Sequence, residues 1–153
     1  MNLNETKNIK AVFIIEVVGR PPEHLTETLK NIIEKMKGEK GVSIINQKIN
    51  NPVLMKDQKD FYTNFAEVEL DIESPQKLTY MVFGYMPAHV EVIYPENINL
   101  TNDNFTAILN ELARRLHGYD EIARVIQVEK NILEKKLKSI LSEKKKPEEE
   151  EKK

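Results

Sequence analysis

The feature that most constrains the fold is an apolar stretch near the N-terminus, IKAVFIIEVV at residues 9–18. It is rich in β-branched and aromatic residues, which is typical of a β-strand. Successive side chains of a strand point to opposite faces, so Phe13 and Ile15 share one face and Val12 and Ile14 share the other. Because both faces are apolar, we expect a central strand that is covered on both sides, wholly or in part.

Proline, glycine and polar caps divide the rest of the first hundred residues into short elements. A repeat of 3.6 residues predicts helices there, and alternation predicts strands. In chain order we expect a strand at 9–18, a helix at 23–37, strands at 42–49 and 61–72, a helix that starts at Ser74-Pro75 and ends before Pro87, and a strand at 89–94. With right-handed crossovers this order predicts an α+β fold, a ferredoxin-like βαββαβ antiparallel sheet at residues 1–98 with both helices on one face.

The rest of the chain is predicted to be a two-helix extension at residues 99–143 and a charged tail. The first helix should run from Thr101 or Asn102 to about His117, because Gly118 breaks or kinks a helix. The second should span about 119–142. The tail at 144–153, KKKPEEEEKK, has charge without apolar residues, which is typical of disorder.

The predicted fold leaves one apolar sheet face without a helix. Each strand contributes to it, through Val12, Ile14, Val18, Ile45, Phe65 and Ile93. A patch of this size rarely stays exposed on a monomer. We therefore expect helices of the extension to cover it, with dimerisation through the last helix, which carries Ile122, Ile126, Leu133 and Leu137. Glu129 and Lys136 interrupt a strict heptad repeat in that helix.

Composition excludes several classes of protein. A net charge of −2 over 153 residues gives no general attraction to nucleic acid or to an anionic membrane. The absence of cysteine rules out disulfides and cysteine-based zinc sites. No apolar run approaches the ~20 residues that span a bilayer, and the first ten residues lack a signal-peptide core. We expect a cytoplasmic protein without a membrane partner.

Acidic residues and a histidine are expected on the outer sheet face, at Glu16, Glu67, Glu69, Glu91 and His89. Such a set could hold a divalent cation or do acid–base chemistry, so an enzyme or metal site on this face stays an alternative. No ligand-spacing motif accompanies these residues, and charges commonly keep an exposed sheet face from aggregating. We therefore expect no catalytic residue, metal or cofactor. The same carboxylates would repel RNA phosphates, which disfavours a nucleic-acid partner.

Two loops stand out. The segment Val53-Leu54-Met55 is apolar where a loop is usually polar, so it is a candidate protein contact or folds back onto the C-terminal helices. The turn after the first strand, Gly19-Arg20-Pro21-Pro22, leads directly into a helix.

The stretch VGRPPEHL at residues 18–25 resembles the turn of ACT domains, small regulatory modules with the same strand order. The Arg-Pro pair and the downstream leucine agree, whereas Gly19 stands at the family's acidic position and Pro22 at its glycine. The resemblance covers about the first two-thirds of the chain. It implies dimerisation and an amino-acid site that includes Gly19, Arg20, Pro21 and Pro22.

Taken together, these features favour a non-enzymatic interaction or regulatory module that self-associates or binds a protein partner. A small-molecule sensor of ACT type is the alternative.

Overall fold

The computed structural model describes residues 8–56 and 59–150, and the side chains up to Ser142. The chain divides into two compact units, Met1–Phe105 and Thr106–Lys153. The first unit holds the sheet and two helices, and the second holds most of one long helix.

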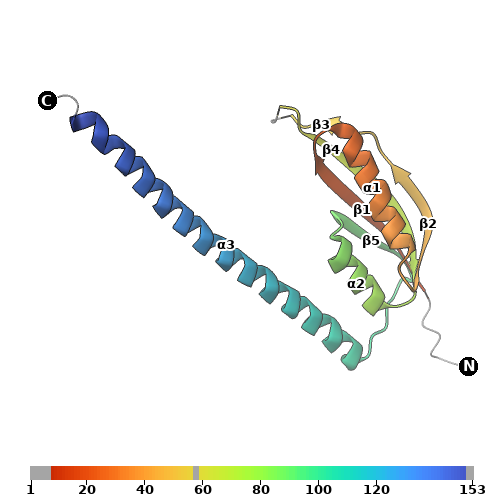
Figure 1. The fold of residues 1–153 in the computed structure, drawn as a ribbon. Helices are drawn as coiled ribbons and strands as arrows, with labels where there is room; N and C mark the ends of the chain where they lie inside the picture. The colour runs from red at the N-terminus through yellow and green to blue at the C-terminus, as the bar shows by residue number, and fades with distance from the viewer. Residues whose placement is uncertain (1–7, 57–58, 151–153) are drawn as a thin grey trace, which may run out of the picture. The chain divides into compact units, whose positions relative to one another are not determined.

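The sheet of the first unit is antiparallel, with strand order β2-β4-β1-β5 (Figure 1). Its strands are β1 (Ile9–Gly19), β2 (Val42–Ile49), β4 (Tyr62–Ile72) and β5 (His89–Tyr94), with a short β3 (Val53–Leu54) paired to β4. The prediction of an α+β fold with an antiparallel sheet is confirmed. β1 and β4 are the inner strands and hold most of the buried strand residues, because each is flanked by strands on both edges.

Helices α1 (Pro22–Lys37) and α2 (Pro75–Tyr85) lie on the same side of the sheet (Figure 1). Both contribute to one core, in which Leu29, Ile33 and Met36 of α1 and Met81 of α2 are buried. They pack on the inner sheet face, formed by Ala11, Phe13, Ile15, Ala66, Val68 and Leu70. Alternation along β1 and β4 therefore predicted the buried face.

The helix ends follow the predicted chemistry. Ser74 Oγ accepts a hydrogen bond of 3.2 Å from the Lys77 amide at the start of α2. Gly38 caps the end of α1, where its amide donates to the carbonyls of Glu34 and Lys35. Proline in the first turn of each helix costs no hydrogen bond, because the amides of that turn have no partner within the helix.

The opposite sheet face is apolar at its centre and polar around it. Val12 and Ile14 are half-buried, whereas Val18, Phe65 and Ile93 are 52%, 41% and 52% exposed. On the neighbouring strand β4, Glu67 pairs with Ile14 and Glu69 pairs with Val12.

The region after residue 99 corrects one prediction. In place of two helices broken at Gly118, a single helix, α3 (Asn102–Glu150), runs through that residue (Figure 1). One glycine costs only about 1 kcal/mol in a helix interior, which its neighbours offset. α3 also includes 144–150, for which we predicted disorder, while 151–153 lie outside the described residues. Thr101 Oγ1 accepts from the Asn104 amide at the start of α3.

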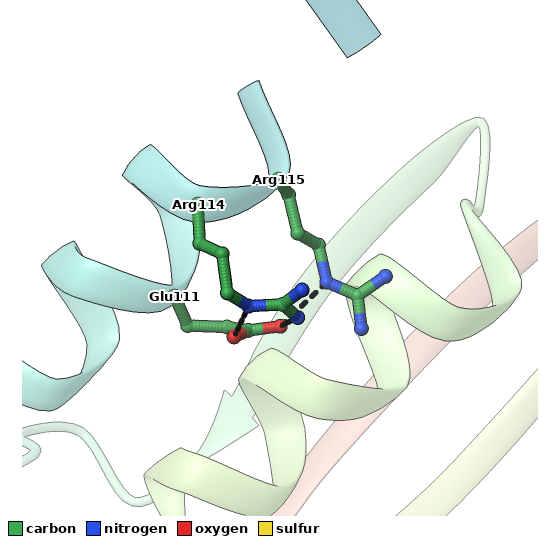
Figure 2. A network of polar contacts seen from close by, with 3 residues as sticks. All are labelled: Glu111, Arg114 and Arg115. Atoms are coloured by element: carbon green, nitrogen blue, oxygen red, sulfur yellow. Dashed lines mark hydrogen bonds and ion pairs between the residues drawn. The ribbon is translucent and has the colours of Figure 1, made fainter. Parts of the chain in front are cut away.

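A cluster of ion pairs lies on α3 before the glycine. Figure 2 shows Glu111 paired with Arg114 and Arg115, and the two arginines are about one turn before Gly118. Arg114 donates from Nε and Nη2 to the carboxylate at 2.9 and 2.7 Å, and Arg115 Nε donates at 2.6 Å. Hydrogen bonds from Arg114 and then Arg115 lower the pKa of Glu111 to about 2.

In the part of the chain that the structure describes, no helix combines the length and apolar content needed to cross a membrane.

A second polar cluster joins α2 to the turn after α1. Lys77 Nζ lies 2.8 Å from Glu39 Oε2, and the Tyr85 hydroxyl donates to Glu39 Oε1 at 3.1 Å. The hydrogen bond from Lys77 lowers the pKa of Glu39; burial opposes this, and the Tyr85 hydroxyl adds to it. Burial and the Glu39 carboxylate raise the pKa of Tyr85 to about 12. The cluster therefore favours an ionised Glu39 beside a neutral tyrosine.

We predict that Glu39→Gln lowers the free energy of unfolding by about 1–2 kcal/mol at pH 7, because hydrogen bonds to a charged group contribute about 1.5–3 kcal/mol and the Glu39 side chain is partly exposed. Because folding depresses the pKa of Glu39, its contribution is present above the ordinary value of 4.5 and is lost as pH falls through the folded value. Urea unfolding at one protein concentration, from pH 7 down to pH 3, should show the two proteins converging. Glu34→Gln, which removes an exposed pair with Lys37, is the control and should change little. A pH-independent difference would contradict this assignment.

Candidate functional site

The turn after β1 forms one wall of an open groove. Antiparallel pairing places Gly19, at the end of β1, opposite Tyr62, at the start of β4. The turn that follows β1 therefore lies beside the segment that precedes β4. The groove has a volume of about 500 Å³ and is lined by Arg20, Pro21, Pro22, Asp60 and Tyr62.

Local geometry holds each groove residue in place. The Arg20–Pro21 peptide bond is cis, and Pro22 begins α1. The Arg20 guanidinium lies 5.4 Å from the centre of the Phe61 ring, a cation–π contact that ties the turn to the hairpin. Asp60 has φ of 61°, a left-handed conformation that aspartate tolerates better than most residues.

The groove carries one cationic side chain, Arg20, and one carboxylate, Asp60, and the rings of Pro21, Pro22 and Tyr62 complete its lining. Arg20 presents several N–H donors, and Asp60 presents only acceptors when ionised. Pro21 and Pro22 have no amide hydrogen, so the turn cannot cradle a phosphate with backbone donors. A small molecule that carries both a carboxylate and an amine would match this pair of charges.

Of the four predicted turn residues, Arg20, Pro21 and Pro22 line the groove, and Gly19 lies at the strand end beside it. Asp60, Phe61 and Tyr62 were not predicted as part of this site. They could have been predicted from the expected antiparallel pairing of the first and third predicted strands. Such pairing places the end of one strand next to the start of the other.

The outer-face carboxylates are on one face but are not brought together. Glu67 and His89 lie on opposite sides of Ile14, and Glu69 and Glu91 lie on opposite sides of Val12. Strands are about 4.8 Å apart, so side chains of β4 and β5 are separated by roughly 10 Å of intervening β1. Among the described residues, no group of three or more histidine, cysteine, aspartate or glutamate side chains could hold a metal ion. Glu16 accepts a hydrogen bond of 2.7 Å from Thr63.

The apolar hairpin segment forms β3 instead of an irregular loop. Val53 and Leu54 pair with Thr63 and Tyr62, and the Met55 amide donates to the Phe61 carbonyl at 2.9 Å. Val53 and Leu54 are nevertheless 60% and 53% exposed. They remain candidates for a protein contact.

Many of the exposed apolar side chains lie on α3. Side chains from Leu109 to Leu141 recur along it, and the four residues predicted as an interface, Ile122, Ile126, Leu133 and Leu137, are 57–65% exposed. Isolated exposed leucines are common on protein surfaces, whereas a large exposed apolar patch is unusual on a monomer.

Comparisons with known proteins place the chain in a family. No curated protein and no solved structure matches it. One family description matches residues 10–145, which includes the sheet, the groove and nearly the whole of α3. The chain therefore belongs to the MJ0538 family.

Proposed function

We propose that this protein is a non-enzymatic interaction or regulatory module that works as a homo-oligomer. The observation that carries the proposal is the row of exposed apolar side chains along α3. Burial of each leucine or isoleucine side chain contributes about 1.5–3 kcal/mol, so a row of this length favours association strongly. The family match extends through residue 145, so it includes most of this helix together with the sheet.

We further infer that the first unit is ferredoxin-like. The order β2-β4-β1-β5, with α1 between β1 and β2 and α2 between β4 and β5, supports this assignment. Domains of this architecture carry many functions, so the fold alone does not assign one.

Light scattering on the full-length chain tests self-association. We expect a mass that is a multiple of 17.8 kDa at micromolar concentration. A monomer across the micromolar range would contradict the proposal, because exposed apolar rows of this length should associate there.

The groove favours a second candidate function, a sensor of small zwitterionic molecules such as amino acids. Arg20 could bind the carboxylate of the ligand, and Asp60 could bind its amine. The resemblance of the turn to that of ACT domains supports the same class of ligand.

We predict that a matching amino acid, at ten times its dissociation constant, raises the free energy of unfolding by about 1.4 kcal/mol. A thermal-shift screen with millimolar amino acids measures this. Asp60→Asn should abolish the shift, because asparagine keeps the left-handed backbone and removes the charge. Asp103→Asn in α3 is the matched control and should leave the shift unchanged. If no amino acid moves the midpoint, the groove is not such a sensor.

A further inference from the structure

α3 is too long for the sheet of its own chain to cover. Its 49 residues extend over about 70 Å at 1.5 Å per residue. The longest strands have 11 residues, or about 35 Å at 3.3 Å per residue. The apolar row from Leu109 to Leu141 is about 48 Å long, so about a quarter of it must contact another partner or stay exposed. A partner of equal length and matching periodicity is a second α3.

Ten positions of α3 form a heptad repeat when counted through Gly118. In this numbering the a positions are Leu109, Leu116, Ala123, Lys130 and Leu137, and the d positions are Leu112, Tyr119, Ile126, Leu133 and Ile140. All but Lys130 are apolar or aromatic, which is the pattern of a coiled-coil seam. We call these ten residues the seam.

Glu129 and Lys136 do not interrupt this seam. Each is at a g position, beside the seam, where charged residues form pairs between helices. The one charge inside the seam is Lys130, at an a position. Its side chain is 62% exposed, and Nζ lies 3.9 Å from Glu134 Oε1 on the same helix.

We propose that α3 pairs with α3 of a second copy as a parallel, in-register, two-stranded coiled coil. In that arrangement each a residue contacts the same a residue of the partner helix. It also lies beside the g residue that directly precedes that position on the partner helix. Lys130 would then lie beside the partner's Glu129, with Glu134 on its own helix, so carboxylates surround both lysines. This inference rests on the proposed self-association and adds its orientation and register.

An antiparallel pair gives the Lys130 ammonium a less favourable environment. There, a positions meet d positions, so Lys130 would lie opposite Tyr119 or Leu112, depending on the register. In the antiparallel register with the longest overlap, Leu109 meets Ile140, and Arg115 faces Lys136 at the flanking g positions. The contact between Arg115 and Lys136 and the loss of a carboxylate beside Lys130 disfavour this arrangement, and a single lysine at an a position is a known determinant of register.

Cysteine crosslinking of the full-length chain tests the orientation, because the natural sequence has no cysteine. Ile140→Cys should form a disulfide-linked dimer with oxidised glutathione, at least tenfold more than Ser139→Cys, which lies outside the seam. In an antiparallel pair the two Ile140 positions would be about 45 Å apart, far beyond disulfide reach. A mixture of Leu109→Cys and Ile140→Cys would then crosslink instead, and that result would overturn the proposal.

Light scattering on the reduced Ile140→Cys protein separates the two levels of inference. A dimer that does not crosslink overturns the parallel register and leaves self-association standing, whereas a monomer overturns both.

Lys130→Leu provides a second readout, since a polar residue at an a position specifies register at a cost in stability. We expect this variant to dimerise at least tenfold more tightly. Weaker association would show that Lys130 is not in the seam.

Discussion

Replacing Leu133 and Leu137 with aspartate is expected to convert the associated protein to a monomer of 17.8 kDa at micromolar concentration. The two leucines are 65% and 57% exposed on the single chain, and the proposed pairing buries both. A dimer would lose four leucines, at about 1.5–3 kcal/mol each, or at least about 6 kcal/mol in all. Since about 1.4 kcal/mol is tenfold, the dissociation constant should rise roughly ten-thousand-fold or more.

The matched control is Ser139→Asp with Ser142→Asp. It adds the same two charges to the same part of α3, at positions outside the seam. Light scattering or sedimentation over a concentration series should show that this control keeps the mass of the natural protein. If the control dissociates as readily as the leucine variant, added charge and not the seam governs association.

Replacing Phe13 with alanine is expected to lower the free energy of unfolding by about 3–5 kcal/mol, the usual cost of removing a buried aromatic ring. The Phe13 side chain is fully buried, between Val68 on β4 and Val90 on β5. Alanine would leave a cavity in the centre of the core. Since small proteins are stable by only about 5–15 kcal/mol, this is a large share of the total.

Phe65→Ala serves as the matched control, because Phe65 lies on the neighbouring strand and is 41% exposed on the outer face. Urea unfolding at fixed protein concentration should show a cost below about 1.5 kcal/mol, since less apolar surface is lost from a half-exposed site. Equal costs for Phe13 and Phe65 would mean that the outer face is buried as deeply as the core.

Short-range patterns predicted most of the first unit. Alternation located β1, β2, β4 and β5 to within a residue or two, and proline, serine and glycine marked the ends of α1 and α2. These signals are local, since they depend on backbone conformation and on which face of an element is apolar. They also predicted the buried side of β1, although not the two-residue β3.

The predicted break at Gly118 had the largest consequence. Glu129 and Lys136 were interpreted as interruptions of a heptad repeat within the second predicted helix. In the pairing proposed for the continuous α3, the two residues are at flanking positions and Lys130 is in the seam. A single glycine weakens a helix only slightly, and the ion pairs around Glu111 support the turn before it.

The candidate groove was predicted in part. Arg20, Pro21 and Pro22 are next to one another in the sequence and were identified from that turn. Asp60 and Tyr62 are about forty residues further on, and they reach the groove only through the pairing of β1 with β4. A turn motif does not carry that information, because strand pairing is decided by the packing of the whole sheet.

The sequence by itself determined the elements of the first unit apart from β3, the inner sheet face and the net charge, since each follows from side-chain type and spacing along the chain. Only the tertiary structure decided which distant polar groups meet. Glu39 pairs with Lys77 and Tyr85, and buried Asn64 donates to Thr26 at 3.2 Å. Such contacts join residues separated by tens of positions, and their geometry exists only after the core has brought the helices onto the sheet.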